Sequence, residues 1–239
     1  MEENNPYNSL EAPPAAFAAA NEKAAFLKKV YGLLLLGVLG FAGTLWATAN
    51  IGFANDLAMS LGQTIYGNRW GMLIYFGIFM AGQYGVHALA EVKPINKFAY
   101  AGWVVLLGFL TAPFILFVAG TENGMAVINQ ASAATALIFG GLTVYVLWSG
   151  KDFSWLRGIL VMAFWALIVV SILGYFTGYT PGVWLSGAVV LLLSGYILYD
   201  TSVILHHLPT NAAMTGAILL FTDVALLFKQ LVWLFLDRD

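Results

Sequence analysis

The chain has 239 residues, of which 61% are hydrophobic and only 9% are charged. A soluble domain carries roughly 25% charged residues, so this composition excludes an ordinary water-soluble globule and indicates an integral membrane protein. The net charge of -2 excludes a strongly basic nucleic-acid binder. The sequence contains no cysteine, which excludes disulfides, thiol nucleophiles and thiolate metal sites.

Seven apolar segments follow a polar N-terminal tail. The tail covers residues 1–25, and we expect it to be disordered and not to be a signal peptide. A helix that crosses a bilayer needs about 20 residues. The expected spans are residues 26–48, 70–90, 98–119, 125–148, 155–176, 183–205 and 211–236, with a longer loop containing Asp56, Asn68 and Arg69 between the first two. The sequence therefore predicts an all-α bundle of seven transmembrane helices over residues 26–239.

The distribution of Lys and Arg predicts how the chain is oriented in the membrane, because cytoplasmic loops carry an excess of both. One side has Lys23, Lys28, Lys29, Lys93, Lys97, Lys151 and Arg157, and the other has Arg69, Lys229 and Arg238. We therefore expect a cytoplasmic N-terminus and, with seven full spans, an external C-terminus. In an alternative arrangement the seventh segment re-enters, which would return Lys229 and Arg238 to the cytoplasm.

Two aspartates lie within the last two apolar segments: Asp200 in GYILYDTS and Asp223 in LLFTDVALL. An ionised carboxylate is costly in hydrocarbon, so a residue of this kind is a functional candidate by default. The two segments form a hairpin. A turn centred at residues 211–212 would place both aspartates at the same depth, whereas a turn at 208–209 would leave them about 10 Å apart in depth.

Two carboxyl groups that meet in an apolar site share a proton at neutral pH rather than both ionising. When deprotonated, the same oxygens suit a hard cation such as calcium. Asp200 and Asp223 are therefore candidates for a pH-sensing gate and for a calcium-binding metal site. In the alternative interpretation, each aspartate hydrogen-bonds a neighbouring helix. The partners for that arrangement are Thr201, Ser202, Thr222 and Tyr199.

Three histidines and one tyrosine are accessory candidates. His87 lies near the end of the second span, where a histidine is more often stabilised by the helix dipole alone. His206 and His207 follow the sixth span and are candidate pH sensors, although a metal site would need more ligands than this loop supplies. Tyr199 directly precedes Asp200.

Four segments of the chain resemble the transmembrane Bax inhibitor motif family, in particular its bacterial branch. They are FLKKVYGLLLLG at 26–37, FGGLTVY at 139–145, SGKDFSWL at 149–156 and GYILYDTS at 195–202. The resemblance implies a seven-helix bundle with the last helix at its centre. It also implies a pH-sensitive calcium leak channel gated by two aspartates that correspond to Asp200 and Asp223, with calcium as the permeant or transiently bound ion and no cofactor.

Family members carry a basic residue in the second span that latches onto the aspartates. This chain departs from that pattern, because its second span has no Lys or Arg, only Arg69 before it and His87 near its end. Some bacterial members associate with a membrane-anchored AAA protease. The alternative function is therefore a protease regulator, whose partner would grip the N-terminal tail. Either role would lie in the bacterial inner membrane.

Two further alternatives have less support in the sequence. Tyr199 and Asp200 fit the first motif of presenilin-like intramembrane proteases, but residues 220–223 lack the Gly-x-Gly-Asp of the second. A secondary transporter is conceivable because carboxylates in the membrane also serve coupled transport. The sequence has no Gly-rich phosphate loop with Lys, no HExxH and no Gly-x-Ser-x-Gly elbow. We therefore expect that the protein is not an enzyme.

Overall fold

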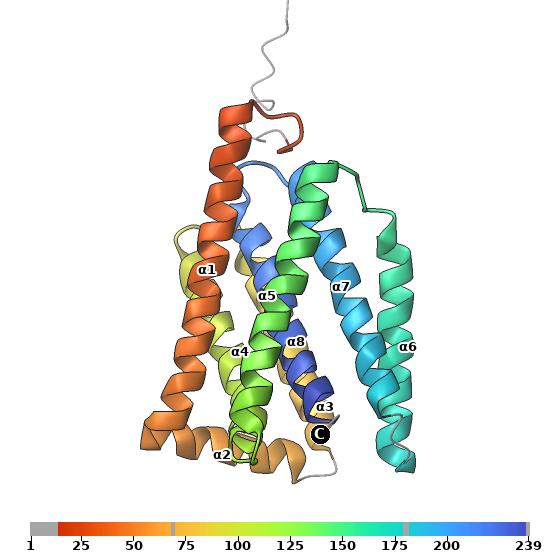
Figure 1. Cartoon of the computed structure of the whole chain (residues 1–239). Coiled ribbons are helices and arrows are strands. Elements are labelled where there is room, and N and C mark those ends of the chain that lie inside the picture. The colour runs from red at the N-terminus through yellow and green to blue at the C-terminus, as the bar shows by residue number, and fades with distance from the viewer. Residues whose placement is uncertain (1–13, 68–69, 179–181, 238–239) are drawn as a thin grey trace, which may run out of the picture.

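The computed structural model describes residues 14–67, 70–178 and 182–237 (Figure 1). These parts of the chain form eight α-helices and no strand. The helices are α1 (Ala20–Asn50), α2 (Gly52–Tyr66), α3 (Gly71–Leu89), α4 (Ile95–Ala119), α5 (Gly124–Ser149), α6 (Leu156–Thr177), α7 (Val183–His206) and α8 (Ala213–Leu236). All except α2 are long and apolar enough to cross a membrane. The prediction of an all-α, multi-pass membrane protein with seven spans is confirmed.

Helix α2 occupies most of the segment that we expected to be a loop between the first two spans. Its 15 residues rise only about 22 Å, which is too short to cross a hydrocarbon core of about 30 Å. Its buried residues recur every three or four positions and so form one face: Ala54, Ala58, Gly62 and Ile65. Figure 1 shows α2 lying across the end of the bundle. The loop prediction was therefore wrong for this helix, while Asn68 and Arg69 lie outside the described residues.

Helix α1 begins at Ala20, earlier than the span expected from residue 26, so the last residues of the expected tail are helical. Just before this helix, the backbone N–H of Ala15 donates a hydrogen bond to the carbonyl oxygen of Leu208 at 3.1 Å. This contact places the start of the described chain against the connection between α7 and α8. Residues 1–13, which make up most of the expected tail, lie outside the described residues.

The connections between the helices divide the bundle into two faces. We call the end that contains the start of α1 the N-terminal face; it also carries the connections at 90–94, 150–155 and 207–212 (Figure 1). Helix α2 and the end of α8 lie at the opposite end. Helix α8 is one continuous helix of 24 residues between these ends, long and apolar enough to cross a membrane, and it does not turn back as a re-entrant segment would. Arg238 lies outside the described residues.

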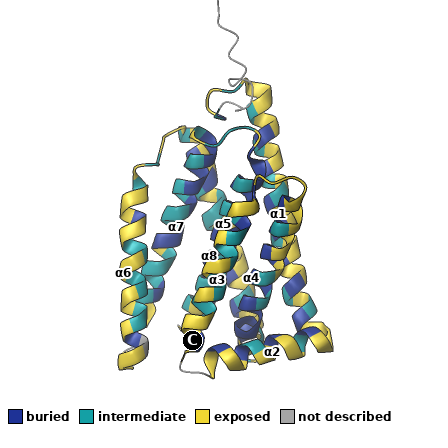
Figure 2. Cartoon of the chain, turned by 180° about the vertical axis from the view of Figure 1, so that it is seen from behind, coloured by how far each residue is buried: buried dark blue, intermediate teal, exposed yellow. Residues whose placement is uncertain are grey.

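Helix α8 packs against α1, α3, α4, α5 and α7, whereas α6 packs against α7. Figure 2 shows the contrast, with exposed residues prevailing along α6 and buried ones along α8 and α4. The central position of the last helix stays a prediction, since α4 is also largely buried.

One close approach in the core depends on a glycine. The hydroxyl of Tyr100 on α4 donates a hydrogen bond to the carbonyl oxygen of Leu33 at 3.0 Å. A Cβ atom at Gly37 would collide with that hydroxyl, so only glycine allows α1 and α4 to approach this closely. The Tyr100 ring also packs edge-on against Phe221 of α8, with 5.8 Å between the centroids. These contacts fix α8 against its neighbours and thereby position the polar residues on its other side.

Candidate functional site

The two membrane aspartates lie together inside the bundle. Asp200 on α7 is 7% exposed and Asp223 on α8 is 6% exposed. The two carboxyl groups are neighbours, close enough to interact with each other directly. The α7–α8 connection covers residues 207–212, so its midpoint lies between the two turn centres considered from the sequence. Because a carboxylate oxygen can only accept, a hydrogen bond between two carboxyl groups requires that at least one of them holds a proton.

The aspartate pair lines a cavity of about 550 Å³ that lies between α3, α6, α7 and α8. Much of the cavity wall is apolar. Its other polar side chains are Tyr75, Gln83, Ser171, Tyr196, Thr222, Lys229 and Gln230. The Oδ2 atom of Asp223 is buried and has no hydrogen-bond partner among the described residues, so it is the acceptor in this site that remains unsatisfied. The arrangement offers a few oxygen ligands in an otherwise apolar chamber.

The basic residue of this cavity comes from α8 and not from α3. The Nζ atom of Lys229 donates a hydrogen bond to the hydroxyl of Tyr75 at 2.8 Å and lies 4.1 Å from the centroid of the same ring. Tyr75 belongs to α3, the second span, which has no Lys or Arg. The contact therefore joins the last helix to the second span through a cation, close to the chamber that holds the aspartates.

A row of polar contacts leads from the aspartate pair toward the N-terminal face. The indole N–H of Trp103 donates to Oγ1 of Thr222 at 2.9 Å, and this hydroxyl donates to the carbonyl oxygen of Ile218 at 2.9 Å. Oε1 of Gln83 lies 3.5 Å from the same hydroxyl, and its Nε2 lies 3.0 Å from Nε2 of His87. His87 is therefore linked to the neighbourhood of the pair through Gln83 and does not touch either aspartate.

The alternative interpretation assigned the aspartates to hydrogen bonds with nearby hydroxyl groups. In the described residues those hydroxyls have other contacts or none: Ser202 lies against Asp152, Thr222 bonds Ile218, and buried Oγ1 of Thr201 has no partner. Tyr199 does not line the cavity. In the described residues these hydroxyls therefore do not form the separate bonds that this interpretation expected, and each aspartate has the other carboxyl group as a neighbour.

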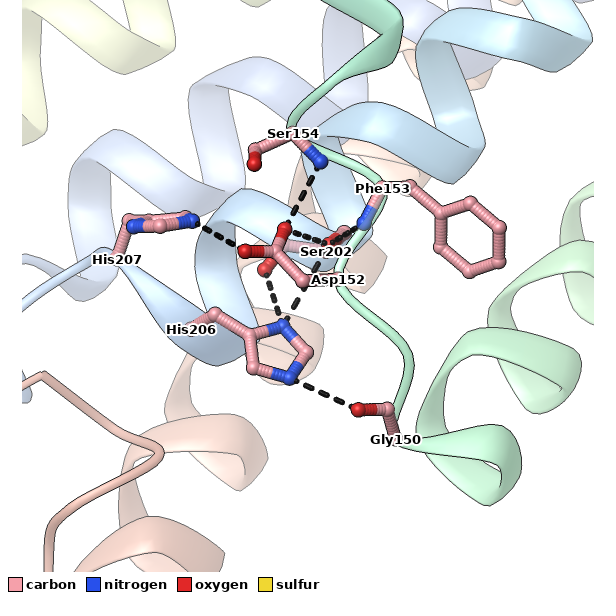
Figure 3. A network of polar contacts seen from close by, with 7 residues as sticks. All are labelled: Gly150, Asp152, Phe153, Ser154, Ser202, His206 and His207. Carbon is pink, nitrogen blue, oxygen red and sulfur yellow. Dashed lines mark hydrogen bonds and ion pairs between the residues drawn. The ribbon is translucent and has the colours of Figure 1, made fainter.

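His206 and His207 belong to a second polar cluster on the N-terminal face (Figure 3). Nε2 of His207 lies 3.0 Å from Oδ2 of Asp152. Nδ1 of His206 lies 3.0 Å from the carbonyl oxygen of Ser202, and its Nε2 lies 3.1 Å from that of Gly150. A neutral imidazole carries one N–H, so only protonated His206 can donate to both carbonyl groups. We call these residues, together with Phe153 and Ser154, the surface network.

Asp152 is the acidic residue of the surface network, and it was not among the predicted site residues. The backbone N–H of Ser154 donates to Oδ1 of Asp152 at 2.8 Å, and this bond lowers the pKa of Asp152 to about 2. Desolvation opposes this effect as the second-largest influence, and the side chains of Ser154, His207 and Ser202 lower the pKa further. The available signal was the Asp-x-Ser spacing in SGKDFSWL, which favours a turn closed by the aspartate side chain.

Neither cluster gathers three or more His, Asp or Glu side chains around one point within the described part of the chain. Calcium takes six to eight oxygen ligands in proteins. At the aspartate pair, a calcium ion would therefore have to keep much of its coordination from water or backbone oxygens. This donor set fits an ion in transit better than a resident structural ion.

The fold and the site define a multi-pass α-helical membrane protein with a buried carboxyl pair in a cavity between its spans. Residues 23–239 match the family model described as Bax1-I, inhibitor of apoptosis-promoting Bax1, so the chain belongs to the Bax inhibitor family. An uncharacterized protein of Pseudomonas aeruginosa is 31% identical over 233 residues, covering 92% of this chain and 93% of that protein. Bax inhibitor 1 of Schizosaccharomyces pombe is 26% identical over 221 residues, covering 92% and 79%. The Golgi anti-apoptotic protein of Vaccinia virus is 29% identical over 220 residues, covering 92% and 88%.

Proposed function

We propose that this protein is a pH-sensitive leak channel for calcium or a similar cation, gated by Asp200 and Asp223. The observation that carries the proposal is the juxtaposition of two buried carboxyl groups that line a cavity between four spans. The pair can hold a proton, and it supplies oxygen ligands when the proton leaves. One site thus provides both the sensor and the cation contact, and no enzymatic role is needed.

The gating step follows from the charge of the pair. While the carboxyl groups share a proton, their hydrogen bond ties α7 to α8. Loss of that proton leaves two like charges in contact, and two unit charges 4 Å apart repel by about 4 kcal/mol at the effective dielectric constant of a protein. Either the helices separate or a cation enters to neutralise the oxygens. Both responses favour conduction as the pH rises.

Lys229 takes part in this gate from α8. It lines the same cavity, and its hydrogen bond to Tyr75 holds its charge beside α3. A fixed positive charge in the chamber opposes the entry of a cation and stabilises a deprotonated carboxyl pair. The basic group that family members carry in the second span is thus replaced here by a group on the last helix.

We place the protein in the inner membrane of a bacterium with its N-terminal face toward the cytoplasm. Most of the basic residues that the structure describes lie on this face. They are Lys23, Lys28, Lys29, Lys93, Lys97, Lys151 and Arg157. Cytoplasmic loops of membrane proteins carry such an excess, and relatives occur in Pseudomonas aeruginosa and Vibrio cholerae. The role as a regulator of a membrane AAA protease stays a prediction, since no contact in the described residues favours it.

The test is calcium flux into liposomes that contain the purified protein, measured from pH 5 to 8. The wild type should show a flux that rises with pH. The double variant Asp200→Asn, Asp223→Asn keeps the size and hydrogen-bonding capacity of both side chains but removes the titration, so its flux should not depend on pH. A double variant with the pH response of the wild type would overturn the proposal.

A further inference from the structure

A second pocket, of about 450 Å³, opens on the N-terminal face, and its lining shares no residue with either polar cluster. Its wall is formed by α1, the 90–94 connection, and the first residues of α4 and α8. Three lysines line it: Lys29, Lys93 and Lys97. The one acidic residue of the lining is Glu91, so the lining carries three positive charges and one negative charge, a net charge of +2.

The positive charge of this pocket is not neutralised by the described part of the chain. Among the described residues, the salt bridge joins His207 to Asp152, outside this pocket. No carboxylate forms a salt bridge with any of the three lysines in that part of the chain. Helices α4 and α8 both begin at the pocket, and neither has a side-chain cap on its first turn. The positive ends of two helix dipoles therefore add to the lysine charges. Together these groups favour an anion with several acceptor oxygens, such as a phosphoester.

Asn96 adds a requirement that an inorganic anion would not meet. It is 6% exposed and lines the pocket, and its Nδ2 donates to the carbonyl oxygen of Ala90 at 3.1 Å. Its Oδ1 atom is buried and has no hydrogen-bond partner within the described residues. A buried acceptor needs a donor. A ligand that satisfies this site must therefore bring a hydroxyl or amine group as well as an anionic oxygen.

The position of the pocket suggests where such a ligand comes from. The pocket lies at the ends of membrane-spanning helices, which is the depth of lipid headgroups. Leu33, Ala212 and Met214 give it an apolar wall beside the charged groups. A phospholipid headgroup combines a phosphodiester with a neighbouring hydroxyl or amine and continues into an apolar chain.

We propose that this pocket binds a phosphoester that carries a neighbouring hydroxyl or amine, as the headgroups of phosphatidylglycerol and phosphatidylethanolamine do. The lysines and the two helix N-termini contact the phosphate, and the hydroxyl or amine donates to Oδ1 of Asn96. The site is separate from the aspartate pair, and it stands or falls independently of the proposed channel function.

The test is native mass spectrometry of the full chain in detergent, titrated with two lipids of equal acyl chains. Phosphatidylglycerol supplies phosphate and hydroxyl groups, whereas phosphatidylmethanol carries the same negative charge on its phosphate but has no donor. Phosphatidylglycerol should bind roughly tenfold more tightly. The double variant Lys93→Gln, Lys97→Gln should lose roughly 30-fold in affinity for phosphatidylglycerol, since each lysine near an anionic phospholipid contributes about 1 kcal/mol, a factor of about five. The matched variant Lys28→Gln, Lys151→Gln removes two lysines of the same face outside the pocket and should bind as the wild type does.

Asn96→Leu tests the donor requirement. This variant should lose the preference for phosphatidylglycerol while it still binds phosphatidylmethanol, and that retained binding shows that the pocket is folded. Free glycerol phosphate, added as a competitor, distinguishes a lipid from a soluble phosphoester. If the pocket is a site for a soluble phosphoester, this compound displaces lipid from the pocket at concentrations that leave lipid bound elsewhere on the protein. If the pocket is a lipid site, lipid stays bound in it. Equal lipid affinity in the wild type, the pocket variant and the matched variant would overturn the proposal.

Discussion

In both the aspartate pair and the surface network, an aspartate connects α7 to a neighbouring segment of the chain. The two environments differ in their exposure to solvent. Asp200 and Asp223 are almost fully buried, whereas the side chain of Asp152 is 42% exposed. Asp152 receives a backbone N–H, and its lowered pKa keeps it ionised. In the buried pair, each carboxyl group has the other as its neighbour, and a hydrogen bond between them requires that one of them holds a proton. The same residue type is a fixed charge in the surface network and, in the gate that we propose, a proton store in the buried pair.

The difference in environment predicts a difference in coupling energy. We expect a double-mutant cycle on Asp200→Asn and Asp223→Asn, measured as thermal unfolding in detergent at pH 5, to give a coupling energy of about 2 kcal/mol. The physical reason is that the two carboxyl groups interact in a buried and largely apolar cavity, where a hydrogen bond is stronger than in water. A coupling energy near zero would mean that the two side chains do not depend on each other, which contradicts the contact described above.

Lys229 offers a smaller effect within the same cavity. Lys229→Gln removes the positive charge that opposes a cation in the chamber, and we expect calcium flux at pH 8 to rise by about threefold, the factor for roughly 0.6 kcal/mol of repulsion. Lys229→Arg keeps the charge beside Tyr75 and serves as the matched control. A flux that falls in Lys229→Gln but not in Lys229→Arg would show that this charge supports conduction instead.

The surface network should give a much weaker coupling than the buried pair. A cycle on Asp152→Asn and His207→Gln should yield about 0.5 kcal/mol at pH 6, because exposed ion pairs are screened by water and salt. Unfolding measured at low and high salt checks the cause, since screening should reduce the coupling further. If this cycle equals or exceeds the cycle on the buried pair, the contrast between the two regions is wrong.

The contribution of Asp152 should vanish in acid and be constant near neutral pH. Its folded-state pKa of about 2 lies below the ordinary value of 3.8. A lowered pKa means that its stabilisation is fully present above pH 3.8 and is lost as the pH falls toward 2. In the His207→Gln background, where the pair with His207 is absent, the difference in melting temperature between Asp152 and Asp152→Asn should therefore be flat from pH 5 to 8 and shrink between pH 4 and 2. A difference that changes between pH 5 and 8 would contradict the assignment.

The positions of the spans could be predicted from the sequence because each is a continuous apolar run bounded by polar turns. The segment expected at residues 70–90 is α3 at Gly71–Leu89, and the one at 125–148 is α5 at Gly124–Ser149. Helix α2 was missed for a physical reason. Only every third or fourth of its residues is buried, and it is too short to read as a span.

The site could be predicted only in part, because its contacts join distant parts of the chain. The cost of a charge in hydrocarbon marked Asp200 and Asp223, but the register of the hairpin decides whether they meet, and residues 207–212 alone do not reveal it. The contact from Lys229 to Tyr75 spans 154 residues, and that from His207 to Asp152 spans 55. No local pattern at either end indicates its partner.

The measurement that tests the central claim most directly compares the two regions in one flux experiment. Calcium entry into liposomes is followed from pH 5 to 8 for the wild type, for Asp200→Asn with Asp223→Asn, and for Asp152→Asn with His207→Gln. We predict that the first double variant loses the pH response and that the second keeps it. A response that survives in the buried-pair variant and disappears in the surface variant would contradict the account and assign the sensor to the surface network.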